Sequence, residues 1–517
     1  MARSFTPAWL DADPVAVALL ERGFADRQAR ARAAERARDR VIDPRLVTAW
    51  AAQEARRPTS AARRASLAAV AEGAPVIVTG QQAGLFLGPL YTLHKAATAV
   101  VDARALAAEL GRPVVPVFWL QTEDHDVAEI RSVGLPGADA PQLIALDDAL
   151  GPAVERVSIA HRALGPRVGD ALAELRTHLQ GPHAGEVIEL LARHYRPEAT
   201  WGEAMGATIA ELFADHGLLV LDPRDPALGP LARPVHGRAI ARARDVADAL
   251  ETRARAIVEA GFEVQIKPRE LALSCHHVGG PEGPRQRVPL DRGDLLAELE
   301  VAPERFSTTA LLRPILQDSW LPTVGYVGGP GELAYFAELP PLYAFFDLPM
   351  PLAIPRARFR LATPAARRLA EQLGLSTTDA ARPLDELARA ADPAADPTLP
   401  IAGAFDVALD AALARLGELA EAARDHGFAR AAPKSAEHIR HAFHRLVERV
   451  RHARQEADHV THERLLRFRG LLAPRGEPQE RTLGFMAFAA QVGPRALVDR
   501  IVSAVVPFDG ALREIDL

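Results

Sequence analysis

The chain has 517 residues, of which 48% are hydrophobic and 25% charged, with a formal net charge of −6. The length favours about two to four domains, and the acidic balance gives no general attraction to nucleic acid. The single cysteine, Cys275, excludes an internal disulfide and a multi-cysteine zinc site, and no apolar run approaches the roughly 18 residues of a membrane span. We therefore expect a cytoplasmic protein that binds neither nucleic acid nor membrane.

Strand-like and helix-like segments alternate from residue 76 onward. Residues 14–70 precede them and predict helices, with a basic, solvated face between 27 and 40. Strands that alternate with longer helices build parallel sheets, so the pattern predicts an α/β, doubly wound, Rossmann-like core. Residues 281–300 predict a polar insertion with a short hairpin. The expected strands are Val76–Thr79, Val114–Leu120, Leu218–Leu221, Glu263–Ile266 and Thr323–Val327, and the expected helices fall near 89–110, 168–195, 201–215 and 228–259.

A glycine-rich loop follows the first strand. Gly80, Gly84 and Gly88 lead into a helix near Pro89, with a spacing that fits neither the dinucleotide fingerprint nor the P-loop. A strand, a glycine turn and a helix together indicate an anion or nucleotide site, although glycines also serve simply to make tight turns. The neighbouring side chains that we assign to binding are Gln81, Gln82, Tyr91 and Lys95, the last of which is alternatively a surface lysine.

Acidic side chains and a histidine follow the second strand. Glu123, Asp124, His125 and Asp126 stand directly after the apolar run that ends at Leu120. Ligands gather beyond the carboxyl ends of parallel strands, and crowded carboxylates need partners there. We interpret Asp124, His125 and Asp126 as catalytic candidates and Glu123 as a binding residue. The alternative is that the aspartates cap the next helix and that Glu123 pairs with an arginine.

A second glycine turn follows the strand at 323–327. Gly328, Gly329 and Gly331 bring backbone amides close to a ligand, and Glu332 lies in the first turn of the following helix. Glu332 either faces the site or complements the helix dipole.

Beyond Pro355 the pattern changes to that of long helices. Apolar residues repeat at spacings of four and three on both sides of a break at Gly427 and Pro433, which predicts an antiparallel coiled-coil hairpin. A further helix is expected over 362–390. The two predicted seams consist of Phe405, Leu409, Ala412, Leu416, Leu419 and Ala423, and of Ile439, Phe443, Leu446, Val450, Ala453, Ala457 and Val460.

These patterns divide the chain into three parts. Residues 1–361 form the core with its N-terminal helices and insertions, and residues 362–472 form the helical coiled-coil domain. Residues 473–517 form a C-terminal segment that packs back on the core. The histidines of the second long helix are interpreted as solvated surface, so no metal site is predicted beyond Mg²⁺ that accompanies a nucleotide.

Three long motifs occur in a fixed order: T-G-Q-Q-A-G-L-F-L-G-P-L-Y, F-W-L-Q-T-E-D-H-D and G-Y-V-G-G-P-G-E-L-A-Y-F. In these the chain resembles the cysteine-adding enzymes of bacillithiol biosynthesis, also described as cysteine ligases. The resemblance implies a nucleotide-binding core related to class I aminoacyl-tRNA synthetases and a coiled coil that forms a homodimer. It also implies attachment of cysteine to glucosaminyl malate.

Under this resemblance the carboxyl of cysteine requires activation, for which ATP or another nucleotide is the expected donor. Asp124 or His125 would act at the amine, and Arg269 or Arg313 would hold a malate carboxylate by a bidentate contact. The chain lacks the H-x-G-H and lysine-rich loops of the synthetases, so the donor stays open. The alternatives are another nucleotide-dependent small-molecule ligase or nucleotidyltransferase on the same core, and a non-catalytic nucleotide-binding dimer.

Overall fold

The computed structural model describes residues 3–38, 40–146, 156–266, 271–391, 399–422, 426–455 and 459–517. At its centre lies a five-stranded sheet with the order β10-β9-β1-β2-β5, in which every neighbouring pair is parallel. The predicted fold class, a Rossmann-like parallel sheet with a coiled-coil domain, is confirmed. The five strands are β1 (Val76–Gln82), β2 (Val115–Gln121), β5 (Leu219–Leu221), β9 (Thr323–Gly328) and β10 (Leu352–Pro355).

Side chains that alternate along the strands fill two separate cores. In β2, Val117 and Trp119 lie in one core, while Phe118 and Leu120 lie in the other. The first core is covered mainly by α1 (Phe5–Leu10), α3 (Arg27–Arg38), α4 (Pro44–Ala55), α11 (Gly229–Ala241), α12 (Ala243–Glu259), α14 (Leu312–Trp320), α15 (Pro330–Phe336) and α16 (Pro340–Phe345). The second is covered mainly by α6 (Tyr91–Leu110), α8 (Val168–His178), α9 (Ala184–His194), α10 (Trp201–Leu212), α23 (Met486–Val492) and α24 (Pro494–Ala504).

Smaller elements surround the sheet. They are α2 (Pro14–Leu19), α5 (Ala61–Ala71), α7 (Val127–Ile130), α13 (Leu295–Val301) and α22 (Gln479–Thr482), the hairpin of β3 (Ser132–Leu135) with β4 (Gln142–Ala145), and an antiparallel sheet of β6 (Leu271–His277), β7 (Arg285–Pro289) and β8 (Phe306–Thr308).

The strand expected at Glu263–Ile266 is wrong. These residues join no sheet, and the next strand, β6, begins at Leu271. The backbone amides of Gln265 and Ile266 donate to Oε1 of Glu338, at 2.8 and 3.2 Å. A side chain therefore satisfies the groups that a neighbouring strand would have paired.

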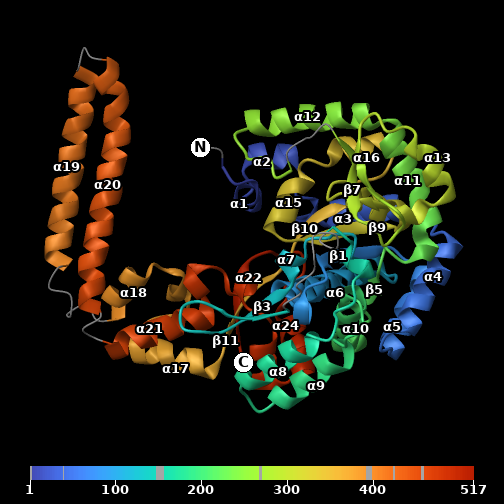
Figure 1. The fold of residues 1–517 in the computed structure, drawn as a ribbon, viewed down its shortest axis with the longest axis horizontal. Helices are drawn as coiled ribbons and strands as arrows, with labels where there is room; N and C mark the ends of the chain where they lie inside the picture. Colours follow the sequence, from blue (N-terminus) through green and yellow to red (C-terminus); the bar gives the residue numbers. More distant parts are fainter. Residues whose placement is uncertain are drawn as a thin grey trace.

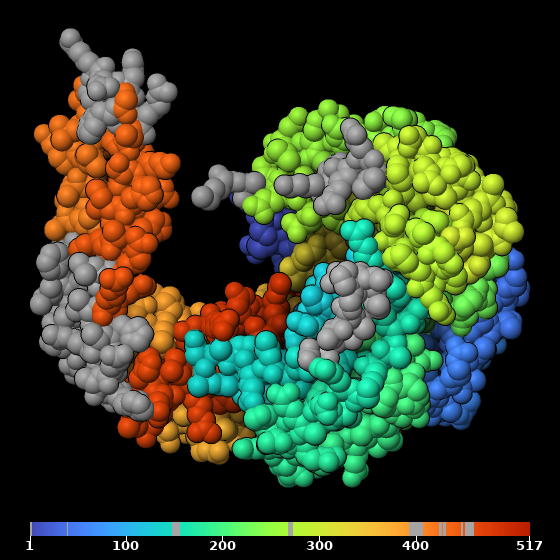
Figure 2. Space-filling model, in the orientation of Figure 1, coloured from blue at the N-terminus to red at the C-terminus, as the bar shows by residue number. Residues whose placement is uncertain are grey.

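A helical arm leaves the core after β11 (Arg358–Ala362). In Figure 1, α19 (Leu399–Ala422) and α20 (His426–Gln455) form a long antiparallel pair, joined to the core through α17 (Pro364–Leu373), α18 (Leu384–Ala391) and α21 (His459–Leu472). Figure 2 shows this arm standing beside the core across an open gap. Within the described residues, no helix is long and apolar enough to cross a membrane.

Two details of the predicted coiled coil are wrong. Gly427 and Pro433 both lie inside α20, so neither ends a helix. Among the residues of α19 whose burial the structure describes, Leu413 and Ala420 are buried, whereas Leu419 of the predicted seam is 50% exposed.

The C-terminal segment returns to the core. Its last strand, β12 (Leu512–Asp516), pairs in parallel with β11, while α23 and α24 pack into the second core. The backbone N–H of Phe508 donates to Oδ1 of Asp102 on α6, at 2.8 Å. Residues far apart in the sequence thus complete one packed body around the sheet.

Candidate functional site

Three predicted loops meet at the carboxyl edge of the sheet. From β1 the chain proceeds to β2 and β5 on one side, and it then returns to form β9 and β10 on the other side. The topological switch point therefore lies between β1 and β9, and ligands of open α/β sheets bind at such points. Three adjacent strands, β9, β1 and β2, lead into these loops: the glycine turn follows β9, the glycine loop follows β1, and the acidic segment follows β2.

Lys95 lies at the centre of this switch point. The residue is 3% exposed, which excludes the alternative of a surface lysine. Its Nζ donates to the backbone oxygen of Gly80 at 2.8 Å and to Oε1 of Gln81 at 2.9 Å, and it forms an ion pair with Glu332. Burial lowers the pKa of Lys95, and the carboxylate of Glu332 opposes that shift.

Glu332 joins the lysine to the second glycine turn. Its carboxylate accepts the backbone N–H of Gly329 at 2.9 Å and the hydroxyl of Tyr326 at 2.6 Å. Burial alone would raise the pKa of Glu332, but Lys95 and these donors hold it below its usual value. Glu332 therefore acts as an internal anion that occupies the amide of the turn.

Arg313 does not face open space. It is 5% exposed, and its Nη2 donates to the hydroxyl of Tyr335 at 2.7 Å and to that of Tyr326 at 3.3 Å. The predicted contact with a substrate carboxylate is thus replaced by contacts that orient two tyrosines. Arg269, the other predicted carboxylate ligand, lies outside the described residues.

Asp124 and His125 form a second group beside the first. Asp124 Oδ2 accepts Nε2 of Gln82 at 2.7 Å, and its Oδ1 lies 3.3 Å from His125 Nδ1 and 3.7 Å from Arg285 Nη1. Burial would raise the pKa of Asp124, but the hydrogen bonds from His125 and the charge of Arg285 hold it well below the ordinary range. Gln82 thus connects the loops after β1 and β2.

The other two acidic residues of this segment have structural contacts. Glu123 accepts the backbone N–H of Thr308 at 2.9 Å and also its hydroxyl. The alternative of an arginine partner holds only through charge, since Glu123 raises the pKa of the nearby Arg224 but forms no direct ion pair with an arginine of the described residues. Asp126 caps α7 by accepting the N–H of Glu129 at 3.3 Å. The capping alternative holds for Asp126.

The glycines of the loop after β1 are required for different physical reasons. A Cβ at Gly80 would meet the backbone oxygen of Trp119 at 2.8 Å, so the neighbouring strand demands glycine there. Gly88 has φ +66°, which favours glycine, and its N–H donates to Leu85 inside the loop. A Cβ at Gly84 would meet Gly88 Cα at 3.1 Å. The turn is tight and closed on itself.

The turn after β9 is more open. A Cβ at Gly328 would lie 3.2 Å from that of Glu332, and one at Gly329 would lie 3.4 Å from Arg356 Nε. A Cβ at Gly331 would meet no atom within 4 Å.

Sequence reasoning missed several residues that complete the two groups. Tyr326 and Tyr335 stand inside the motif around Gly328, where two polar aromatic residues were the available signal. Arg356 was also missed, and it lies over the ring of the predicted Tyr91 at 5.5 Å. The hydroxyl of Tyr91 accepts a hydrogen bond from Nε2 of Gln81 at 3.3 Å. Only the folded chain brings Arg285, from β7, to Asp124.

The sheet order and the switch-point loops, together with the helical arm, define a Rossmann-like α/β protein with a coiled-coil domain. The family model of the bacillithiol biosynthesis BshC N-terminal Rossmann-like domain matches residues 18–357, and that of the C-terminal coiled-coil domain matches residues 359–516. The chain belongs to the BshC family.

Curated relatives agree with this assignment. A protein of Koribacter versatilis is 34% identical over 478 residues, which cover 89% of this chain and 87% of the relative. Proteins of Salinibacter ruber and Geobacillus kaustophilus are 33% and 31% identical over 334 residues each, covering 59% and 60% of this chain and 57% and 59% of the relatives. All three carry the name "Putative cysteine ligase BshC".

Proposed function

We propose that this protein is a ligase that adds L-cysteine to glucosaminyl malate in bacillithiol biosynthesis. The observation that carries the proposal is the similarity to the Koribacter versatilis protein over 89% of the chain. The match includes the sheet, the switch point and the arm, so it is not confined to a common nucleotide-binding fold. The substrates are small molecules, and the arm is proposed to form a homodimer.

The proposed reaction joins the carboxyl carbon of cysteine to the amine of the sugar conjugate. Amide formation from a free carboxylate is unfavourable in water, so we propose that a nucleoside triphosphate, ATP or another, activates the carboxyl first. A carboxylate oxygen of cysteine attacks a phosphorus atom of the triphosphate, a new O–P bond forms, and the P–O bond to the leaving nucleoside diphosphate or pyrophosphate breaks. The amine then attacks the carbonyl carbon and the new C–N bond forms. The bond between the carbonyl carbon and the phosphoryl oxygen breaks, and the phosphate or nucleotide leaves with that oxygen. The nitrogen loses a proton to a base. Mg²⁺ would enter only together with the nucleotide.

The geometry supports a division of roles within the second group. Asp124 is a weak base because its pKa is held low, whereas catalysis near neutrality needs a base with a pKa close to the working pH. Nδ1 of His125 lies 3.3 Å from both Asp124 Oδ1 and Arg285 Nη1. In the tautomer that donates from Nδ1 to Asp124, Nε2 of His125 would be free to accept a proton. We assign proton transfer to His125 and its orientation to Asp124.

The residues around Lys95 and Glu332, which form the first group, support a role in positioning the substrate and the nucleotide. Gln81, Gln82 and Tyr91 are half-buried at the strand ends, where their amide and hydroxyl groups can reach sugar hydroxyls, malate or ribose. Lys95 and Glu332 connect the two glycine turns through their hydrogen bonds and their ion pair. The nucleotide would thus bind against the two turns, on the side that faces away from this ion pair.

A deletion strain tests this proposal. Mass spectrometry of low-molecular-weight thiols should show loss of the cysteinyl product and accumulation of glucosaminyl malate, and the wild-type gene should reverse both. The His125→Ala gene should not reverse them, while the protein accumulates normally. An unchanged thiol profile in the deletion strain would refute the assigned substrates.

A further inference from the structure

A separate cavity lies at the carboxyl end of β5, away from the switch point. Its volume is about 660 Å³, and none of the predicted site residues that the structure describes lines it. Its walls come from the C-terminal end of α4, the N-terminal half of α10, the segment after β5 and the residues at 160–161. Elements distant in sequence thus enclose a space large enough for a small metabolite.

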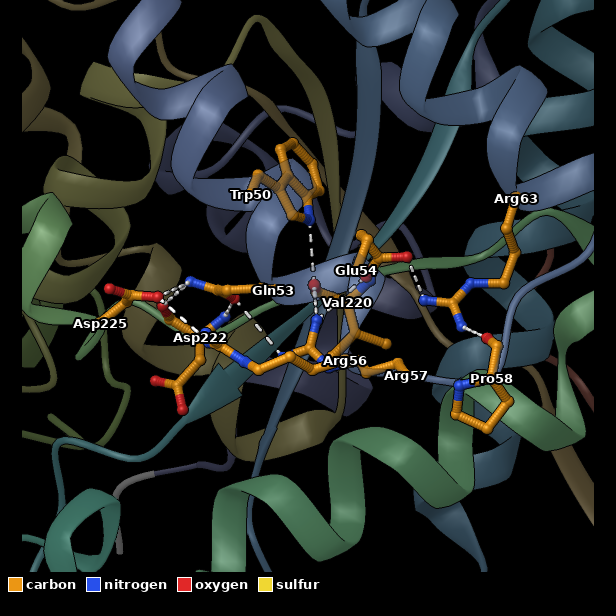
Figure 3. A network of polar contacts seen from close by, with 10 residues as sticks. All are labelled: Trp50, Gln53, Glu54, Arg56, Arg57, Pro58, Arg63, Val220, Asp222 and Asp225. Carbon is orange, nitrogen blue, oxygen red and sulfur yellow. Dashed lines mark hydrogen bonds and ion pairs between the residues drawn. The ribbon is translucent and has the colours of Figure 1, made fainter.

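The wall formed by α4 is fixed by a polar network (Figure 3). Gln53 and the backbone of Asp222 exchange two hydrogen bonds, at 2.9 and 3.0 Å. Arg57 Nη1 donates to Glu54 Oε1 at 3.0 Å, and the same oxygen accepts the N–H of Val220 at 3.2 Å. These bonds hold the end of β5 against α4, so the cavity wall is preorganised.

Arg224 is the unusual residue of this cavity. It is 8% exposed, yet within the described part of the chain its guanidinium forms no ion pair with a carboxylate. Nη1 donates to the backbone oxygen of Phe306 at 2.7 Å, Nη2 lies 3.4 Å from Nε2 of His161, and the buried Nε has no hydrogen-bond partner. The carboxylates of Glu123 and Asp222 act on Arg224 only through their charge, without a direct ion pair, and burial still lowers the pKa of its guanidinium. An anion bound directly to the guanidinium would offset the cost of burying it.

The other arginines of the cavity are already paired. Arg56 meets Asp225 at 3.4 Å and Arg196 meets Glu198 at 3.2 Å, while Arg193 pairs with Glu211. The buried cation of the switch point, Lys95, is likewise paired, because Glu332 is its internal anion. Arg224 therefore stands out among these cations as the one that a ligand anion would complete.

An acceptor lies on the same segment as Arg224. Asp222 Oδ1 accepts the hydroxyl of Thr122 at 2.5 Å and the N–H of Arg224 at 3.0 Å, whereas its Oδ2 accepts no hydrogen bond from the described residues. A carboxylate oxygen of this kind suits a hydroxyl or ammonium donor. The described residues that line the cavity include no phenylalanine, tyrosine or tryptophan, so they offer little for a nucleobase to stack on.

We propose that this cavity is a second ligand site, which binds a small aliphatic anion through Arg224 and its hydroxyl or amino groups through Asp222. The anionic group is a carboxylate, as in a hydroxy acid, or a phosphate, as in a sugar phosphate. The site is independent of the proposed ligase reaction, since none of the residues assigned to that reaction lines it.

Isothermal titration calorimetry of the full-length protein with L-malate and, separately, with inorganic phosphate tests this proposal. At least one probe should bind at one site per chain, and the probe that binds identifies the anionic group. Arg224→Gln should weaken binding at least about tenfold, because a hydrogen-bonded charge is lost. The control, Arg244→Gln, removes an exposed arginine on α12 and should leave the affinity unchanged.

A second variant decides the case if Arg224→Gln fails to fold. Ala207 on α10 lines the cavity and is half-buried, so Ala207→Phe fills the space without changing the charge. Binding should be lost while the melting temperature is retained. Lys95→Met, at the switch point, should bind the probe as the wild type does. The proposal is overturned if neither probe binds, if Ala207→Phe still binds, or if Lys95→Met alone abolishes binding.

Discussion

Lys95 and Glu332 form an ion pair at the point where β1 and β9 end, in which the side chain of Lys95 is 4% exposed and that of Glu332 is 16% exposed. Each partner also has neutral hydrogen bonds, to Gly80 and Gln81 on one side and to Gly329 and Tyr326 on the other. Buried pairs add little net stability, but removing one partner leaves an uncompensated charge. The pair therefore fixes the relative position of the two glycine turns.

Glu332→Gln should lower the free energy of unfolding of the core by about 3–5 kcal/mol, because the ammonium of Lys95 would stay buried without its carboxylate. Urea denaturation measures the loss. Adding Lys95→Met should recover part of it. Glu418→Gln is the control, since its pair with Arg415 is mostly exposed and is worth less than about 1 kcal/mol. Equal losses for Glu332→Gln and Glu418→Gln would contradict the buried pair.

Asp102 predicts a pH dependence of stability. It is fully buried, its Oδ2 has no hydrogen-bond partner, and burial raises its pKa from 3.8 to about 8 despite the N–H of Phe508. The folded state keeps a proton that the unfolded chain releases near pH 3.8. Stability therefore falls as the pH rises between these two values, by about 1.4 kcal/mol per pH unit at most, and the loss is complete above the folded pKa.

Asp102→Asn removes this penalty, because a neutral amide oxygen can still accept the N–H of Phe508. The variant should be more stable than the wild type at about pH 8.5 and equally stable at about pH 4. Urea denaturation at both pH values measures the difference. A stability change of the same size at both values would show that Asp102 is already ionised in the folded protein.

At the scale of elements, the two glycine turns have different tolerances. Gly88 has φ +66° and ψ −148°, a conformation that is nearly exclusive to glycine. Gly88→Ala should therefore destabilise the protein by about 1–3 kcal/mol. Gly331→Ala should be neutral or stabilising, since a Cβ meets no atom within 4 Å and the residue lies in α15. Thermal unfolding compares them, and a Gly331→Ala variant destabilised as much as Gly88→Ala would contradict the open space around the Gly331 Cβ position.

Much of the fold could be predicted from local patterns. Apolar runs that end in glycine or acidic residues located β1, β2, β5 and β9 within a few residues. The false strand at 263–266 depends on Glu338, whose carboxylate accepts two of its amides from more than 70 residues away. In α19 the neighbouring pairs Ala412–Leu413 and Leu419–Ala420 both fit spacings of four and three, so only packing against α20 decides which residue is buried.

The candidate site shows the same limit. The loops that meet at the switch point could be predicted because adjacent parallel strands end at one edge of the sheet. The sequence could not predict which side chains point into the site. Glu123 accepts hydrogen bonds from Thr308, and Arg313 donates to two tyrosines. The ion pair of Arg285 with Asp124 joins residues that are 161 positions apart, and no local pattern signals it.

At the scale of the whole molecule, the arm leaves apolar side chains uncovered. Val407 and Leu419 of α19 are 72% and 50% exposed, while Leu413 and Ala420 are buried. Exposed apolar residues along a helix favour contact with a partner, which supports the proposed homodimer.

If the arm forms the proposed homodimer, substituting Val407 and Leu419 together by Glu should convert it to a monomer, because an unpaired charge buried in an interface costs several kcal/mol. Light scattering measures the mass, and circular dichroism should show that the helices persist. Val258→Glu is the control, since Val258 is 59% exposed on α12, outside the arm. A double variant that stays dimeric would place the subunit contact elsewhere.

Activation of the cysteine carboxyl is the central chemical claim, and isotope transfer tests it most directly. The purified protein would be incubated with glucosaminyl malate, a nucleoside triphosphate and L-cysteine that carries ¹⁸O in its carboxyl group. The account predicts a cysteinyl product by mass spectrometry and ¹⁸O in the phosphate of the released nucleotide or in inorganic phosphate. A product formed without label in either phosphate, or no product with any nucleotide, would contradict it.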